Sequence, residues 1–430
     1  MSVRSWHGGR VLAQFGAQFE NRMVNEMITR GEQMLALRKR RMAESHPFFR
    51  GGYRPFFAGG ALWALIALAL WLCALGGAIT LPTHFDPLAW HRHEMLFGFV
   101  GAVIAGFLLT AIPNWTGRLP IAGMPLAMLF GLWLSARMAV LFSAHLGPLL
   151  AASLDVGFFV VLAALAAREV FAAKNRNVPI VVIVLLFAIA DAVDHLAAAG
   201  ILVDEGLGTR AAIALVILMI SLVGGRIVPS FTRNWLMKQG VQRGLPTQSD
   251  RFDKIVIAMT ATTMAGWLIS PMSSSVGYIL ISVAVLQAIR LARWSGVRAW
   301  RDPLVLVLHV GYAWIPIGLC LLGLSLVGTA VPGSGAIHAL TAGAMATMTL
   351  AVMTRATLGH TGRELRADGW TSAIYVLVTL GAALRVAAPL LPFDYMRTIE
   401  LAGVLWGGAF VLFVFAYGPK LFGPRPDGRP

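Results

Sequence analysis

The stretch DPLAWHRHEMLFGFVGAVIAGFLLTAI (residues 86–112) decides the fold class. From Met95 to Ile112 it has no charged side chain, and a helix of about 20 apolar residues crosses the roughly 30 Å hydrocarbon core of a bilayer. Over the whole chain of 430 residues, 57% are hydrophobic and only 13% are charged, which is outside the usual range of soluble proteins. The chain is therefore predicted to be an integral membrane protein.

Apolar runs of similar length recur along the chain, without the two-residue alternation of membrane barrel strands. They predict an all-α polytopic bundle with twelve transmembrane helices, at residues 55–79, 91–113, 121–143, 149–167, 179–200, 209–229, 255–270, 275–293, 303–326, 334–357, 371–391 and 396–418. We therefore divide the chain into an N-terminal tail (1–45), a transmembrane domain (46–420) and a C-terminal tail (421–430). Within the first tail, residues 19–41 are predicted to form a surface helix. No convincing repeat relates the two six-span halves.

The positions of the positive charges predict the orientation in the membrane. Thirty of the 35 Lys and Arg residues fall in tails and loops on the same side as the N terminus. Because positively charged loops stay in the cytoplasm, we expect both termini to be cytoplasmic. The five residues that do not follow this rule are Arg92, Arg137, Arg210, Arg385 and Arg397.

Charge and cysteine content exclude other classes. The net charge of +15 is spread over the inner loops, which favours attraction to anionic membrane lipids over nucleic-acid binding. Cys73 and Cys320 both lie inside predicted spans. We therefore expect neither a disulfide framework nor a thiolate metal cluster.

Seven of the ten histidines lie in or beside the predicted spans. Four of them fall near the outer membrane surface and are predicted to bind metal: His91, His93, His195 and His338. Three fall on the inner side, where a second group is expected: His46, His309 and His360. The others lie in the tail or in turns and are given no role: His7, His84 and His145.

Ionisable side chains inside a membrane are costly and are functional candidates by default. Neutral imidazole binds heme iron, copper and non-heme iron. The seven histidines suffice for a heme with two His ligands, a heme with one and a three-His metal. His91 and His93 point about 200° apart on a regular helix, so we expect them to face different centres. The candidates for moving protons, of which Glu94 is the best placed, are Glu94, Asp191, Asp194 and Glu364.

Five motifs, in this order, resemble the NnrS family. They are HPFFRGGYRPFF (46–57), the stretch from DPLAWHRHEM to AIPNWTGR (86–118), GGRIVPSFTRNWL (224–236), LHVGYAWIPIGL (308–319) and HALTAGAMATMTLAVMTRATLGHTGREL (338–365). The resemblance implies a protein of the bacterial inner membrane that contains heme b and copper. It also implies production with denitrification functions and a role in relief of nitric oxide and nitrosative stress.

The histidines of the family's motifs correspond to the seven selected above by depth. Non-heme iron remains an alternative to copper as the second metal. The arginines that flank the motifs suit heme propionates or lipid phosphate, because guanidinium forms forked hydrogen bonds with both. These are Arg54, Arg118, Arg226, Arg233, Arg355 and Arg363.

The leading hypothesis is a nitric oxide reductase-like enzyme that forms nitrous oxide, with Glu94 as a catalytic group and an electron donor as partner. One alternative is a non-catalytic heme protein that senses nitric oxide or transfers electrons. A further alternative is a twelve-helix transporter of a metal, heme or small anion, in which the histidines bind the cargo transiently.

Overall fold

The computed structural model describes residues 32–33, 36–37, 40, 43–247 and 249–428. In these residues the secondary structure is helical, without a strand. Twelve helices of this part are long and apolar enough to cross a membrane, so the prediction of a twelve-helix bundle is confirmed. Most of the predicted surface helix at 19–41 lies outside the described residues, and the division into tails and transmembrane domain stays a prediction.

The first six spans are α2 (Tyr53–Leu75), the continuous run of α3 (Pro87–His93), η2 (Glu94–Val100) and α4 (Gly101–Thr116), α5 (Met124–Leu141), α7 (Pro148–Ala172), α8 (Val178–Ala198) and α9 (Leu207–Lys238). The other six are α10 (Arg251–Ile269), α11 (Ser274–Ala292), α12 (Pro303–Leu326), the run of α13 (Gly333–His338), η4 (Ala339–Met345) and α14 (Ala346–His360), α15 (Gly369–Ala387) with η5 (Ala388–Leu390), and α16 (Tyr395–Phe422). Short helices connect them: η1 (Pro47–Phe49), α6 (Ser143–Leu146) and η3 (Gly296–Ala299).

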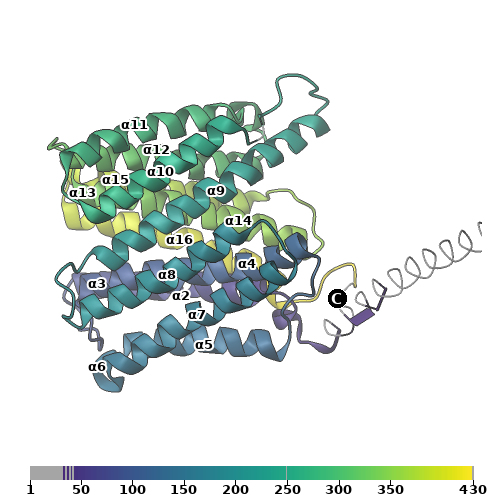
Figure 1. The fold of residues 1–430 in the computed structure, drawn as a ribbon, viewed down its shortest axis with the longest axis horizontal. Helices are drawn as coiled ribbons and strands as arrows, with labels where there is room; N and C mark the ends of the chain where they lie inside the picture. Colours follow the sequence, from purple (N-terminus) through teal and green to yellow (C-terminus); the bar gives the residue numbers. More distant parts are fainter. Residues whose placement is uncertain (1–31, 34–35, 38–39, 41–42, 248, 429–430) are drawn as a thin grey trace, which may run out of the picture.

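The spans lie side by side, with α5 and α7 along one edge of the bundle and α10 and α11 along the other (Figure 1). We call the end that carries α3, α6 and α13 the α3 end. The opposite end, where α2 begins and α16 finishes, is the terminal end (Figure 1). Both described ends of the chain therefore lie at the same end of the bundle, as an even number of spans requires.

Several spans begin at a carboxylate that caps the helix. Asp86 Oδ1 accepts hydrogen bonds from the backbone N–H groups of Leu88 and Ala89, and Pro87 occupies the first helical turn. Asp302 repeats this arrangement before α12, where it accepts from Leu304 N at 2.9 Å. A side-chain cap satisfies backbone donors that have no partner within the helix, and Pro is favoured where no such donor is needed. The Asp-Pro pairs thus set where these spans start.

Two spans contain a π-helical segment at equivalent positions. His93 is followed directly by the π-helix η2, and His338 by the π-helix η4, each of seven residues. Each of these two spans ends near a Thr-Gly-Arg sequence. The backbone of its glycine is in the left-handed region, with φ +68° at Gly117 and +69° at Gly362. π-Helical turns are rare and occur frequently at functional sites. Their repetition marks the two histidines as related positions in the fold.

The same two segments pack a glycine beneath a tryptophan of the preceding span. A Cβ atom on Gly98 would lie 2.7 Å from Nε1 of Trp63, and one on Gly343 would lie 2.5 Å from Cδ2 of Trp314. The pair formed by α2 and the α3–η2–α4 run is therefore repeated by α12 and the α13–η4–α14 run. The repeat is displaced by eight spans, which explains why a comparison of the two six-span halves does not find it.

We predict that Gly98→Ala and Gly343→Ala each destabilise the protein, by about 1–3 kcal/mol, because the added methyl group overpacks the contact with tryptophan. Gly157→Ala in α7 is the matched control, since its Cβ would meet no described atom within 4 Å. Thermal unfolding in detergent measures the effect. Equal melting temperatures for all three variants and the parent would show that the glycine–tryptophan contacts are not required.

Candidate metal centre

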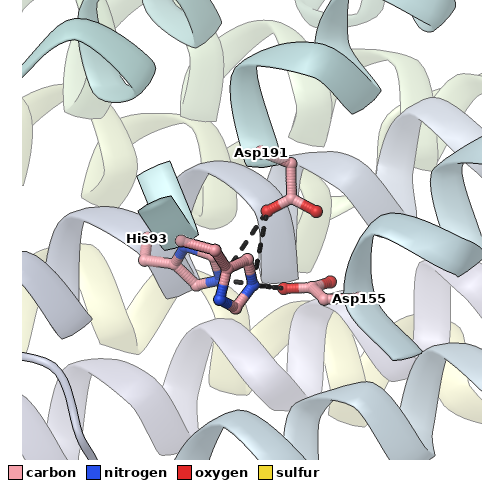
Figure 2. Close-up of side chains that lie close together, drawn as sticks. His93, Asp155 and Asp191 are labelled. Atoms are coloured by element: carbon pink, nitrogen blue, oxygen red, sulfur yellow. Dashed lines mark hydrogen bonds and ion pairs between the residues drawn. The ribbon is translucent and has the colours of Figure 1, made fainter. Parts of the chain in front are cut away.

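Four side chains that can bind a metal ion meet near the α3 end of the bundle. They are His93 at the end of α3, Asp155 in the second turn of α7, and Asp191 and His195 one turn apart on α8. One ligand atom from each lies within 4.8 Å of the others, and the carboxylates of Asp155 and Asp191 both point toward the His93 ring (Figure 2). His93, Asp155 and Asp191 are each 0% exposed. The cluster is therefore shielded from water.

The spacing of the four ligand atoms suits a metal ion. Nε2 of His93 lies 2.8 Å from Oδ2 of Asp155, and Nε2 of His195 lies 3.4 Å from the same oxygen. Both Nε2 atoms lie 3.9 Å from Oδ1 of Asp191. Ligand atoms bound about 2.1 Å from one ion are separated by about 3 to 4 Å in tetrahedral or octahedral geometry. The cluster can therefore hold a metal ion with small movements.

Asp191 is the clearest sign that something binds here. Neither of its oxygens has a hydrogen-bond partner among the described residues, and both are buried. Burying a carboxylate without a partner costs several kcal/mol, so native structures satisfy such groups with protein, water or an ion. A cation bound between Asp191 and the two imidazoles removes this cost.

A second layer of side chains orients His93. Its Nδ1 lies 2.9 Å from Oδ2 of Asp194, whose Oδ1 accepts a hydrogen bond from the hydroxyl of Thr209 at 3.0 Å. Nε2 of His93 lies 2.8 Å from Oδ2 of Asp155, and because an ionised carboxylate only accepts, both ring nitrogens donate in the metal-free protein. A metal ion bound at Nε2 would take the place of that proton and leave Nδ1 donating to Asp194. Carboxylate–histidine pairs of this kind fix the tautomer of a metal-bound imidazole. Helices α8 and α9 pack closely at Asp194, because Gly208 has no side chain there. A Cβ atom on Gly208 would lie 2.6 Å from the backbone nitrogen of Asp194.

Arg137 of α5 supplies positive charge to the cluster. Its Nη1 donates to Oε2 of Glu94 at 2.7 Å, and its Nη2 pairs with Oδ1 of Asp155. Glu94 Oε2 also accepts from Nε1 of Trp63 at 2.6 Å. In the described structure, the other oxygen of Glu94 is buried without a partner. Glu94 therefore lies behind the four-ligand cluster, connected to it through Arg137.

Carboxylates outnumber cations in this region. Among its described residues, the guanidinium of Arg137 and the imidazoles of His93 and His195 stand against four carboxyl groups, those of Glu94, Asp155, Asp191 and Asp194. In a low-dielectric environment, like charges at this spacing repel strongly. A divalent cation neutralises two of the excess negative charges, whereas a monovalent ion neutralises only one.

The other predicted metal ligands do not join this cluster. Of the four histidines predicted near the outer surface, the described cluster contains His93 and His195, while His91 and His338 lie elsewhere at the α3 end. The three predicted inner histidines lie towards the terminal end and have protein contacts. His309 Nε2 lies 2.8 Å from the Thr232 hydroxyl, the His360 ring lies 5.4 Å from Tyr53, and His46 Nδ1 accepts from Phe48 N at 3.3 Å.

Half of the arginines predicted to bind propionate or phosphate are bonded to protein groups. Arg54 donates to the carbonyls of Leu421 and Gly423, Arg118 pairs with Glu169, and Arg226 donates to Asn177. Arg355 lies over the ring of Phe231 at 4.0 Å. Arg233 is half-buried on α9, and Nη1 of Arg363 is buried without a partner in the described chain. Their predicted role remains a prediction.

One member of the cluster, Asp155, and its partner Arg137 were not selected as candidate site residues from the sequence, where histidines were considered first. Each is a single charge inside an apolar run, LLAASLDVGFF (149–159) and GLWLSARMAVL (131–141), and such a charge is itself a functional signal. Of the predicted proton-route residues, Asp191 and Asp194 belong to the cluster or its second layer, whereas Glu364 is exposed beyond α14.

We predict that Asp191→Asn abolishes divalent-metal binding and raises the stability of the metal-free protein, because it replaces a buried carboxyl group that has no hydrogen bond by a neutral amide. Metal-depleted parent protein should melt at a higher temperature when ferrous iron is added, and the variant should not respond. Asp204→Asn, in an exposed loop at the same end, is the control and should respond like the parent. A variant that responds fully would remove Asp191 from the ligand set.

We also predict that Arg137→Gln destabilises the protein by about 3–5 kcal/mol, because it leaves two buried carboxylates without their cation. Combining it with Glu94→Gln should recover part of this loss, since one of those charges is removed as well. Unfolding of the two single variants and the double variant forms the cycle that measures the coupling. Strictly additive effects would contradict a direct Arg137–Glu94 interaction.

Comparison with known proteins gives the family. A family model described as "NnrS protein" matches residues 47–425. A search of the curated proteins gives no match. The matched region includes all twelve described spans and every residue of the metal cluster. The chain therefore belongs to the NnrS family.

Proposed function

We propose that this chain is a heme- and metal-containing enzyme of the bacterial inner membrane that binds nitric oxide and reduces it to nitrous oxide, and so protects against nitrosative stress. The observation that carries the proposal is Asp191, a fully buried carboxylate placed beside two imidazoles with no hydrogen bond of its own in the described structure. Nitric oxide and heme enter through the family resemblance, and the cluster provides a place for the metal.

The ligand set favours non-heme ferrous iron over copper. Two imidazoles and two carboxylates form the cluster, and histidine–carboxylate sets of this kind are typical of non-heme Fe(II) sites. Cu(I) prefers sulfur ligands, and none of these four is sulfur. Bound at this cluster, ferrous iron would supply a redox-active Lewis acid.

The surroundings of the cluster suit a small neutral substrate. The ring of Phe85 lies 4.7 Å and that of Phe97 lies 5.0 Å from the His93 ring. Nitric oxide dissolves in such apolar surroundings, whereas an anion such as nitrite loses its hydration there. The burial of His93 and Asp155 also keeps bulk water away from the reacting molecules.

The reaction combines two nitric oxide molecules, two electrons and two protons into nitrous oxide and water. Glu94 is our candidate for the group that delivers protons, because its Oε1 has no bond in the described structure and lies behind the cluster. The electrons come from a reduced donor at the membrane. With the termini in the cytoplasm, the cluster would lie near the outer face, and the positive loops would contact anionic lipids of the inner leaflet.

The decisive test is a single turnover. Anaerobic, dithionite-reduced protein freed of excess reductant is mixed with nitric oxide, and the nitrous oxide formed is measured by gas chromatography. We expect one nitrous oxide molecule for every two electrons stored, and none from Asp191→Asn. His145→Ala, in an exposed position of α6, is the control and should match the parent.

The two alternative functions give different results in this test. Binding of nitric oxide to heme without nitrous oxide would overturn the enzymatic proposal and support a sensor or electron carrier. A folded protein without heme or metal that moves metal, heme or an anion across proteoliposomes would instead support a transporter.

A further inference from the structure

A groove on the outside of the bundle lies apart from the metal cluster. It runs between α5 and α7, which form one edge of the bundle (Figure 1), and its volume is about 1030 Å³. The connection between α4 and α5, residues 117–122, forms its wall at the terminal end. Sites for small organic ligands have volumes of roughly 300–1,000 Å³. The groove is therefore large enough to hold one such molecule.

The walls of the groove are apolar along most of its length. α5 contributes Met128 and Leu132, and α7 contributes Val161 and Leu165. Met128 and Val161 are exposed, so the walls face the surroundings of the bundle, which in a membrane are hydrocarbon chains. About 10 Å separate Val161 from Arg168 along the axis of α7, at about 1.5 Å per residue. The apolar walls therefore extend from the terminal end toward the middle of the membrane.

Two arginines at the terminal end of the groove share one carboxylate. Nε of Arg118 pairs with Oε2 of Glu169. Arg168 donates to Oε1 of the same residue from Nε at 2.8 Å and pairs with it through Nη2 at 2.7 Å. The Glu169 side chain is only 11% exposed, whereas those of Arg118 and Arg168 are 45% and 62% exposed. The carboxylate therefore holds two guanidiniums that remain open to a ligand.

The charges at this end of the groove favour an anion. The charged residues that line it in the described structure are Arg118, Arg168 and Glu169, so two positive charges and one negative charge give a net charge of +1. The hydrogen bond of the Arg118 guanidinium to Glu169 uses Nε, and guanidinium Nη groups form forked hydrogen bonds with phosphate. Both oxygens of Glu169 already accept from arginine, which disfavours binding of an ammonium group.

We propose that the groove binds one anionic phospholipid, with its phosphate held by Arg118 and Arg168 and an acyl chain lying between α5 and α7. The negative charge of a phosphodiester matches the positive charge of the site, and the acyl chain matches the apolar walls. Basic pockets between transmembrane helices on the cytoplasmic side bind anionic headgroups, and the terminal end is the one predicted to face the cytoplasm. This inference does not depend on the enzymatic proposal.

A lipid bound here would hold together two helices that also carry part of the metal site. α5 and α7 pack against each other, and nearer the α3 end they bring Arg137 to Asp155. A ligand that binds only the folded protein stabilises it. Anionic lipid should therefore raise the melting temperature of the protein.

The test uses the full chain purified in detergent. Native mass spectrometry measures the binding of phosphatidylglycerol and of phosphatidylethanolamine with the same acyl chains, and thermal unfolding measures the stabilisation. We expect one tightly bound phosphatidylglycerol, weaker binding of phosphatidylethanolamine, and a higher melting temperature with phosphatidylglycerol. Glycerol 3-phosphate, which has the phosphate but no acyl chain, should not displace the lipid.

Two variants separate the headgroup from the acyl chain. Arg118→Gln combined with Arg168→Gln should weaken phosphatidylglycerol binding roughly ten-fold or more and abolish the preference over phosphatidylethanolamine. Val161→Trp fills the groove from an exposed position and should weaken the binding of both lipids alike. Arg251→Gln, at an exposed position at the start of α10, is the matched control and should bind both lipids like the parent.

Several results would overturn the proposal. Equal affinity of the parent for the two lipids would reject the anionic headgroup, and displacement by glycerol 3-phosphate would reject the role of the acyl chain. Unchanged phosphatidylglycerol binding in Val161→Trp would reject the groove as the site. This variant alters none of the charged pairs, so it tests the proposal even if the double arginine variant does not fold. A parent dimer that dissociates in Val161→Trp would assign the groove to a second copy of the chain.

Discussion

The repulsion among buried carboxylates at the α3 end is the constraint around which the rest of the site is arranged. Arg137 neutralises part of that charge by pairing with Glu94 and Asp155, whereas Asp191 has no hydrogen bond in the described structure. Folding of the metal-free chain must therefore offset the burial of a carboxyl group that has no hydrogen bond. An ion bound at the cluster would remove this penalty, so metal binding would be coupled to folding.

The helix that carries His91 and His93 directs their side chains to different surroundings. A two-residue step on a helix separates the side chains by about 200°, so one ring joins the carboxylates of α7 and α8 and the other stacks on α2. The π-helix that begins at Glu94 then continues the span past Gly98, beneath Trp63. Trp63 also donates to Glu94, so the packing of α2 and the polar chemistry of the site depend on the same contact.

Most of the fold could be predicted from sequence, because hydrophobic length is a local property. The twelve spans were predicted correctly, with ends that differ mainly where a helix continues beyond the apolar run. α9 is the clearest case: it was predicted to end at residue 229 but continues to Lys238, since a helix that leaves the membrane keeps its hydrogen bonds while its side chains become polar. The repeat by eight spans was not found, because only the two six-span halves were compared and the π-helices and glycine–tryptophan contacts appear only in the structure.

The site was predicted only in part, because it depends on contacts between distant residues. His93 and Asp155 are 62 residues apart and meet only when α3 and α7 pack. One usable signal was nevertheless present in the sequence. The five positive residues outside the inner loops include Arg137, which pairs with Glu94 and Asp155. A positive charge that violates the orientation rule needs another reason to be retained, and for Arg137 that reason is its place beside the metal cluster.

The proposed site requires that His93, Asp155, Asp191 and His195 together bind one divalent metal ion. This can be tested with an experimental structure of the purified protein in which anomalous scattering is measured at the iron absorption edge. We expect a single anomalous peak about 2.1 Å from the Nε2 atoms of both histidines and from an oxygen of Asp191. An Asp191 side chain bonded to ordered water or to protein, with no metal density between it and the histidines, would contradict it.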